Sequence, residues 1–152
     1  MPSDRAYSRF STSIPAVALR LGGKLNVPIY RATRGRVFGR IGRAPVLLLT
    51  TTGRRSGRPR TAPVLYLADG ERLIVIGSNA GNTNTPAWAL NLKANPAAEV
   101  EIRGQRRQVT ARVAEGAERA ELWRRMNAQY AGFDDYRART AREISLFVLE
   151  PR

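Results

Sequence analysis

Six short runs of strand-forming residues, separated by turn residues, occupy most of the chain from Pro45 to its end. The first run is apolar and closes in threonines, which is typical of a strand buried on both faces. Asp69-Gly70 and Gly104 stand between neighbouring runs, as expected of hairpin turns. Six strands, mostly antiparallel, with few helices predict a small, mainly β (α+β) barrel. The runs are Val46–Thr52, Pro63–Leu67, Leu73–Gly77, Glu99–Arg103, Gln108–Val113 and Ile144–Leu149.

Two helical patterns accompany these strands. One helix is expected near Pro86 to Ala94, with Thr85 as its N-cap and Pro86 at its first position. A second is expected near Ala117 to Tyr130. A length of 152 residues suits a single domain. We therefore expect residues 44–152 to form the barrel and residues 1–43 to be a basic helical leader of the same unit.

The leader is rich in arginine, and Ile14, Val17, Leu21 and Leu25 recur in it at helical spacing. Such a segment can lie on an anionic membrane, or it can pack over the end of the barrel with its charged face in water. No apolar run approaches the roughly 18 to 20 residues that cross a bilayer. We expect a cytoplasmic protein. Peripheral contact of the leader with the inner face of the membrane stays open, and so does the formation of a homodimer.

The charge of the chain is strongly one-sided, with 26 Lys and Arg against 12 Asp and Glu and a formal net charge of +14. All of the basic residues except Lys24 and Lys93 are arginine, whose planar fork binds phosphate and carboxylate in a bidentate manner. This field favours polyanionic partners, although biased codon usage also explains many surface arginines. The absence of Cys and His excludes disulfides, thiolate or imidazole metal sites and His-based triads.

The strongest local signal is the segment Thr52–Arg60, here called the arginine hairpin, which joins the first two strands. It combines four arginines, a serine and two glycines in one short connection. Glycines let backbone N–H groups turn toward one point, and arginines supply paired donors to phosphate oxygens. It is not a P-loop, because the Lys-Ser/Thr ending is missing. The alternatives are a phosphate site and a solvated basic hairpin.

Two further segments could border a ligand. Ile76–Gly81 is a strand end with small side chains, beside which a flat ring could approach the backbone. In the following helix, Trp88, Asn91 and Asn95 share one face. The alternative readings are an ordinary loop after a strand and a tryptophan packed in the core.

Taken together and in order, these segments resemble the deazaflavin-dependent nitroreductases of actinobacteria. The resemblance is carried by Ala44–Arg60, Pro63–Tyr66 and Trp88–Pro96, and it extends from about Asn26 to Pro151. It implies a split β-barrel, like that of the flavin reductases, which binds coenzyme F420. This coenzyme carries a phosphodiester and a polyglutamate tail, so the surplus of arginine would have a specific anionic partner.

The resemblance also assigns roles to residues. Some would hold the phosphate and the tail: Arg54, Arg55, Ser56, Gly57 and Arg60. Others would border the deazaflavin ring: Pro63, Val64, Leu65, Gly77, Ser78 and Asn79. Trp88 and Asn91 would close the groove.

The implied activity is the transfer of a hydride from reduced F420 to a small organic acceptor, which is a quinone, a nitroaromatic or an activated enone. Ser78 and Tyr130 are the candidates for stabilising or protonating the acceptor oxygen, and Tyr136 for lining the pocket. Related nitro-reducing enzymes carry a tyrosine cluster in this stretch, whereas this chain has Phe133 in place of one tyrosine. That change weakens the expectation of nitro reduction more than that of quinone reduction or of cofactor binding.

Three other functions remain open. A barrel could bind the deazaflavin, or a related flavin, for storage or regulation without turnover. A flavin- or haem-binding relative of the same barrel class is a second alternative. A nucleic-acid-binding module agrees with the charge, but aromatic platforms between the basic residues are not evident, so no specific nucleic acid is expected.

Overall fold

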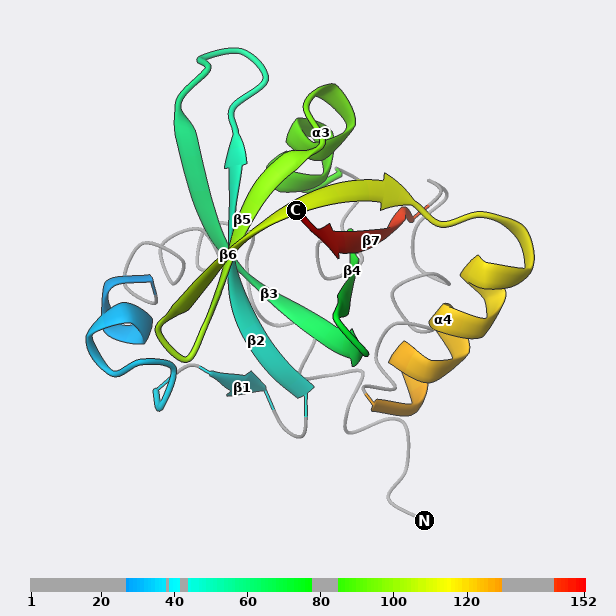
Figure 1. Ribbon diagram of the computed structural model, residues 1–152, viewed down its shortest axis with the longest axis horizontal. Helices are drawn as coiled ribbons and strands as arrows, with labels where there is room; N and C mark the ends of the chain where they lie inside the picture. The colour runs from blue at the N-terminus through cyan, green and yellow to red at the C-terminus, as the bar shows by residue number, and fades with distance from the viewer. Residues whose placement is uncertain (1–26, 38, 42–43, 78–84, 130–143) are drawn as a thin grey trace.

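The computed structural model describes residues 27–37, 39–41, 44–77, 85–129 and 144–152 (Figure 1). Within these ranges the chain forms one seven-stranded sheet and is mainly β. The strands are β1 Arg40–Ile41, β2 Ala44–Thr52, β3 Pro59–Asp69, β4 Arg72–Ile76, β5 Ala97–Ile102, β6 Gln105–Val113 and β7 Leu146–Pro151. The labelled helices are α3 Ala87–Ala94 and α4 Gly116–Gln129, and a further short helix covers residues 27–32.

The sheet closes on itself through β2, which pairs with both β3 and β5. Leu49 faces Ala62 on one side and Val100 on the other. Six strands thus form a closed barrel in the order β2-β3-β4-β7-β6-β5, and β1 adds two residues to the edge of β2. All the described pairings are antiparallel, so the predicted six-stranded barrel is confirmed.

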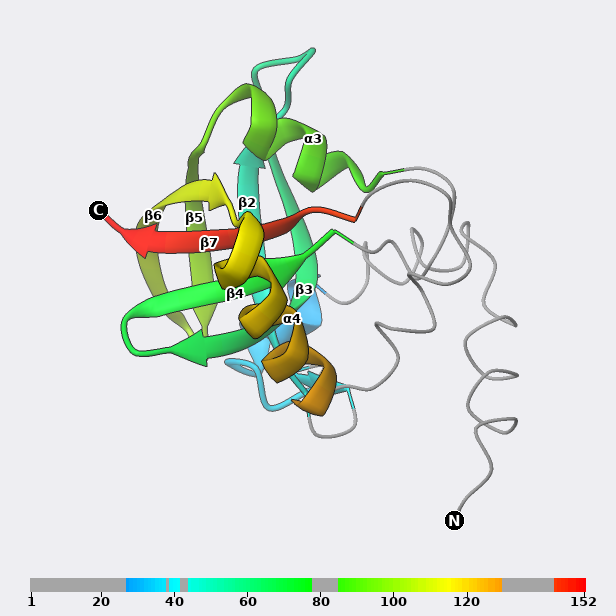
Figure 2. The same cartoon turned by 90° about the vertical axis from the view of Figure 1, so that its right-hand side faces the viewer.

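Two apolar clusters stabilise the fold. The first fills the barrel and includes Leu47, Leu49 and Phe147, all at most 1% exposed. The second lies between the outer surface of β4 and β7 and helix α4, with Trp123 and Met126 from the helix (Figure 2). The apolar residues Val46–Leu49 of β2 are each at most 3% exposed although successive side chains face opposite ways, which confirms the prediction of a strand buried on both faces.

Helix α3 packs its Ala89 and Leu92 against the interior cluster. Its start differs from the prediction by one residue. Pro86, not Thr85, is the N-cap, because Pro86 is extended, with φ −61° and ψ 146°, and its carbonyl accepts the first helical hydrogen bonds from Ala89 and Leu90. No side chain caps the helix, since proline has no polar side chain to do so.

The helix over residues 27–32 is held to the barrel by Tyr30, which is 1% exposed. Its hydroxyl lies 3.0 Å from the carbonyl oxygen of Val46 on β2 and 3.3 Å from that of Glu101 on β5. Residues 1–26, 38 and 42–43 lie outside the described part, so the helical leader and its boundary at residue 43 stay predictions. Among the described helices, none is long and apolar enough to cross a membrane.

Candidate functional site

The arginine hairpin is a tightly bonded turn that projects from one end of the barrel beside α3 (Figure 1). The backbone N–H of Gly53 donates to the carbonyl of Arg58 and that of Gly57 donates to the carbonyl of Gly53, both at 2.8 Å. The N–H of Arg58 donates to the hydroxyl oxygen of Ser56 at 3.2 Å. That bond leaves the hydroxyl hydrogen of Ser56 free to be donated to a ligand.

The hairpin carries an unbalanced positive charge. The side chains of Arg54, Arg55, Arg58 and Arg60 are exposed, and none of them forms an ion pair with an acid of the described residues. Other arginines of the described part form ion pairs: Arg112, for example, contacts Glu118 at 2.5 Å and Glu150 at 2.7 Å. Four unpaired guanidinium groups on one short turn form an electropositive surface suited to an anion.

Asn91 ties the hairpin to α3. Its side-chain oxygen accepts a hydrogen bond from the backbone N–H of Arg54 at 3.0 Å, and its amide nitrogen donates to the hydroxyl of Thr51 at 3.0 Å. Asn91 is 4% exposed and Thr51 2%. Both polar ends of the Asn91 amide are therefore occupied within the protein, and the residue positions the hairpin.

Gly77 and Trp88 lie where α3 meets the barrel. A Cβ on Gly77 would come within 3.2 Å of the Cβ of Ala89, so a glycine lets the helix pack closely. The ring of Trp88 lies 5.8 Å from that of Phe147, tilted by 60°, against the interior cluster. These contacts give both residues packing roles, and their predicted roles toward a ligand stay predictions.

The predicted ring-bordering residues of β3 point in alternate directions. Val64 is buried in the interior cluster, whereas Leu65 packs against the outer cluster beneath α4. Pro63 pairs with Leu48 in the register of β2 and β3 and is half-buried. One flat ligand does not contact all three side chains from one side, because successive side chains of a strand face opposite ways.

Ser78, Asn79, Tyr130 and Tyr136 lie outside the described residues, as does Phe133. The described ends of their segments, however, are near one another in the sheet. Gly77 follows β4, and its N–H donates to the carbonyl of Ser145, which precedes β7, at 2.9 Å. The segment that carries Ser78 therefore begins next to the point where the segment that carries the two tyrosines ends.

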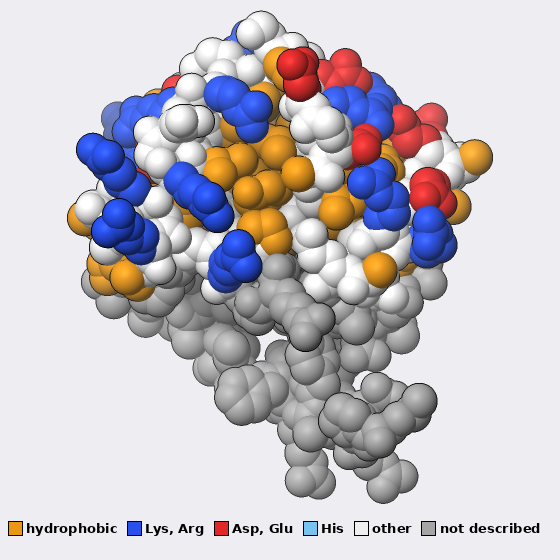
Figure 3. Space-filling view, turned by 60° about the horizontal axis from the view of Figure 1, so that its bottom comes forward, with side chains coloured by type: hydrophobic (Ala, Val, Ile, Leu, Met, Phe, Trp, Pro, Cys, Tyr) orange, Lys and Arg blue, Asp and Glu red, His pale blue; other side chains and the backbone are white. Residues whose placement is uncertain are grey.

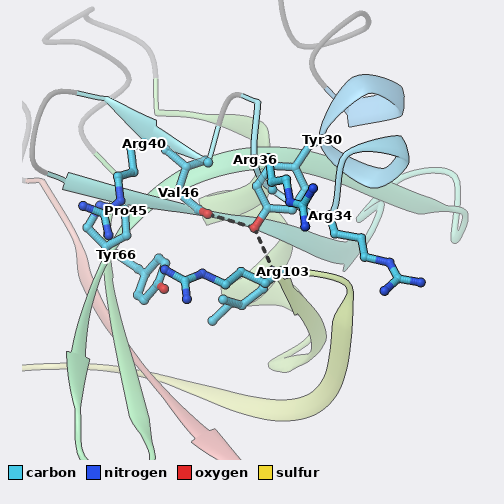
Figure 4. A pocket seen from close by; sticks show the side chains of 11 residues that line it. Tyr30, Arg34, Arg36, Arg40, Pro45, Val46, Tyr66 and Arg103 are labelled. Carbon is cyan, nitrogen blue, oxygen red and sulfur yellow. Dashed lines mark hydrogen bonds between the residues drawn. The ribbon is translucent and has the colours of Figure 1, made fainter.

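Sequence reasoning missed a second group of residues at the opposite end of the barrel. A cavity of about 600 Å³ there is lined by arginines and by Tyr30 and Tyr66 (Figure 4). Burial raises the pKa of the Tyr30 phenol above its ordinary value. The basic leader was the only signal of this group, because its members are widely separated along the chain. No group of acids within the described part could hold a metal ion.

Comparisons with protein families, with individual proteins and with solved structures all indicate the same family. The family described as F420H(2)-dependent quinone reductase matches residues 23–151. An F420H(2)-dependent quinone reductase of Mycobacterium tuberculosis is 38% identical over 133 residues, which cover 85% of this chain and 89% of that protein.

Two solved structures share both the fold and recognisable sequence. One is an F420-H2 dependent reductase, with 33% identity and a TM-score of 0.65, covering 70% of this chain and 94% of its own. The other is described as a domain-swapped dimer, with 29% identity and a TM-score of 0.67, covering 84% of this chain and 95% of its own. Both agree with the closed barrel described above.

Proposed function

Because the chain belongs to the F420H(2)-dependent quinone reductase family, we propose that the hairpin end of its barrel is where reduced F420 binds and meets the quinone. The activity of the chain is the F420H(2)-dependent reduction of quinones. The observation that carries the proposed site is the arginine hairpin, with four guanidinium groups that have no acidic partner within the described residues.

The chemistry of the hairpin fits the coenzyme. A phosphodiester and a glutamate tail present phosphate and carboxylate oxygens, and a guanidinium fork binds either kind in a bidentate manner. Arg54, Arg55 and Arg60 would hold these groups, with Gly57 giving the turn its left-handed bend at φ +69°. The free hydroxyl hydrogen of Ser56 would add one neutral donor. A hydrogen bond to a charged group contributes about 1.5–3 kcal/mol, so these donors together would support firm binding.

The rest of the site would follow from where the neighbouring segments meet the sheet. Pro63, Val64 and Leu65 would border the ring through the backbone of β3, since their side chains face alternate ways. Gly77, Ser78 and Asn79 would border it from the end of β4, and Trp88 with Asn91 would support the wall that α3 forms. When bound, the reduced coenzyme supplies a hydride. Ser78 and Tyr130 would hydrogen-bond or protonate the quinone oxygen, and Tyr136 would line its pocket. A tyrosine hydroxyl has an ordinary pKa near 10, so it is protonated and able to donate at neutral pH.

The first test is a titration of the purified protein with oxidised and reduced F420, followed by turnover with menadione as the quinone. Arg55→Ala should weaken F420 binding about tenfold or more, because it removes a charge-assisted bidentate contact. Arg107→Ala is the matched control, since Arg107 is also exposed and unpaired within the described residues but lies on β6, and it should leave the affinity within about twofold.

The controls of this experiment separate the alternatives. FMN and a short RNA serve as competing ligands. Binding of F420 without oxidation of its reduced form would favour a carrier. Retention of FMN or RNA in place of F420 would reject the coenzyme assignment, and equal losses in the two arginine variants would reject the hairpin as its site.

The oligomeric state and the leader belong to this proposal as well. The domain-swapped dimer among the relatives supports a homodimer, which light scattering would detect as twice the monomer mass. We also propose a cytoplasmic protein whose leader contacts the inner face of the membrane. The test compares the full chain with a chain that lacks residues 1–26 but still contains Tyr30, which holds the short helix to the barrel. Equal co-sedimentation of the two chains with anionic liposomes would reject the membrane contact.

A further inference from the structure

The cavity opposite the arginine hairpin is a basic pocket with an aromatic floor. It has a volume of about 600 Å³, and its lining includes Arg34, Arg36, Arg40, Arg103, Tyr30 and Tyr66, here called the arginine pocket. β2 begins beside this pocket and ends at the hairpin. The eight steps along the chain from Pro45 to Gly53 span roughly 26 Å at about 3.3 Å per residue, so the two basic regions are separated by the length of the barrel.

The charge of this pocket is not balanced by neighbouring acids. None of its four arginines forms an ion pair with an acid of the described residues. The buried carboxylate of Glu101 is nearby in the sheet, but Arg106 contacts it at 2.9 Å and Arg31 at 3.6 Å. Seen from the bottom of Figure 1, the molecule shows a group of hydrophobic side chains edged by several basic ones (Figure 3).

The pocket is held in place by the packing of two turns. Arg34 and Arg103 are the two non-glycine residues of the described part with positive φ, both at 52°. At Arg103 and Gly104, whose φ is 82°, the two-residue turn that joins β5 and β6 requires positive φ at both positions. Each arginine precedes a glycine, and a Cβ on Gly104 would lie 3.3 Å from the Cγ of Arg34, so the two turns are in contact.

Tyr30 forms the rigid floor between these turns. Its hydroxyl lies 3.0 Å from the carbonyl oxygen of Val46 and accepts a hydrogen bond from the N–H of Arg103 at 3.4 Å. A Cβ on Gly35 would lie 3.1 Å from the ring, and Gly35 has a φ of +77°, so both the space and the backbone favour glycine there. In Figure 4 the side chain of Arg103 extends toward Tyr66 across this floor. The arginines thus surround a preformed hollow.

We propose that the arginine pocket binds a small organic anion with at least two phosphate or carboxylate groups. A volume of several hundred Å³ is usual for small-molecule sites. Guanidinium forks recognise the oxygens of both kinds of group, and the tyrosine rings offer an apolar surface to the carbon part of such a ligand. This site is separate from the proposed F420 site and does not depend on it.

The test is an NMR titration of the ¹⁵N-labelled full chain at low salt. Changes in the chemical shifts of backbone amides locate the bound anion. Gly35 and Gly104 report on the arginine pocket, and Gly53 and Gly57 report on the hairpin. Titration with sodium pyrophosphate and, separately, with citrate should shift the Gly35 and Gly104 resonances in a saturable way. The stronger of the two probes identifies phosphate or carboxylate as the preferred group.

Two single variants make the test specific. Arg36→Ala removes a pocket guanidinium whose side chain makes no described hydrogen bond, and it should weaken the binding measured at Gly35 about tenfold. Arg107→Ala removes the same charge outside the pocket and should change it less than twofold. Arg103→Lys keeps the charge but loses the fork, so it should weaken binding severalfold.

Three results would overturn the proposal: shifts confined to Gly53 and Gly57, equal losses in Arg36→Ala and Arg107→Ala, or no saturable shift with either probe. Titration with F420 keeps the two sites apart. Arg36→Ala should leave F420 affinity unchanged, and Arg55→Ala should leave pyrophosphate binding at Gly35 unchanged. The opposite pattern would show that the pocket is part of the coenzyme site.

Discussion

Asn91 shows how a single buried amide can place a charged turn. Its two polar ends bond to the backbone of Arg54 and to the hydroxyl of Thr51, so α3, β2 and the arginine hairpin meet at one side chain. No buried polar side-chain atom among the described residues is left without a hydrogen-bond partner. Because a buried donor or acceptor without a partner is costly, this arrangement favours one position of the hairpin.

Replacement of Asn91 by alanine should therefore lower the free energy of unfolding by about 1–3 kcal/mol, because the N–H of Arg54 and the hydroxyl of Thr51 lose their partner. It should also weaken F420 binding, since the hairpin is no longer held. Urea unfolding and the F420 titration measure the two effects. Asn95→Ala is the control on the same helix: it loses only an exposed bond to the N–H of Ala97, and its cost should be below about 1 kcal/mol. Equal losses in the two variants would contradict the role of Asn91.

At the scale of elements, α4 is attached to the barrel by an apolar face and by a group of ion pairs. Trp123 and Met126 pack on the outer surface of β4 and β7. Arg125 of the helix contacts Asp69 at the β3–β4 turn at 3.0 Å, and Glu118 contacts Arg112 of β6. Since these pairs are partly exposed, each is worth little alone, but together they orient the helix.

Acid should weaken this attachment. Hydrogen bonds from Arg72 and then Arg125 lower the pKa of Asp69 below its ordinary 3.8, and one from Arg112 lowers the pKa of Glu118 below its ordinary 4.5. A carboxyl group with a lowered pKa in the folded state stabilises the fold above its unfolded pKa, and this stabilisation is lost as the pH falls through the folded pKa. The unfolding free energy should thus fall below about pH 4.5.

Urea unfolding between pH 7 and pH 2.5 tests this expectation. The double variant Asp69→Asn with Glu118→Gln should be less stable than the original chain at pH 7 and should approach it at low pH. Glu71→Gln removes an exposed acid outside these pairs and should follow the original chain throughout. A gap between the double variant and the original chain that stays constant with pH would refute the contribution of these carboxylates.

The whole molecule depends on barrel closure between β2 and β5. Leu49 and Val100 face each other across this pairing, and both are 0% exposed. The same closed barrel keeps its two basic regions apart, with the arginine hairpin at one end and the arginine pocket at the other. The net charge of +14 surrounds both regions with a positive field.

Val100→Ala should lower the unfolding free energy by about 2 kcal/mol, because it leaves a cavity at the closing pair of strands. Val113→Ala makes the same change on β6 at a residue that is 41% exposed, and its effect should stay within about 0.5 kcal/mol. Thermal and urea unfolding of both variants provide the measurement. Similar losses of unfolding free energy in Val100→Ala and Val113→Ala would contradict a special contribution of the β2–β5 closure to stability.

Salt should act on ligand binding through the same positive field. The affinity for F420 should fall steadily as NaCl rises from about 20 to 500 mM, because screening shortens the reach of the exposed arginines. The slope should be smaller in Arg55→Ala than in Arg107→Ala, since only Arg55 is proposed to contact the anion. An affinity that is independent of salt would argue against an electrostatic hairpin site.

The strands, the turns and the family could be predicted from the chain alone, because alternation, glycine-containing turns and short motifs are local features of neighbouring residues. The turn at Asp69-Gly70 and the two-sided burial of β2 are examples of this. The start of α3 was missed by one residue, because the backbone of Pro86, not the side chain of Thr85, begins the helix.

The sequence by itself thus determined which segments become strands and which turn carries the concentrated positive charge. Only the tertiary structure decided that β5 closes onto β2, that Asn91 holds the hairpin, and that Tyr30, Tyr66 and Arg103 share one cavity. The physical reason is separation along the chain. Local rules act over a few residues, whereas these contacts join residues that meet only after the barrel has closed.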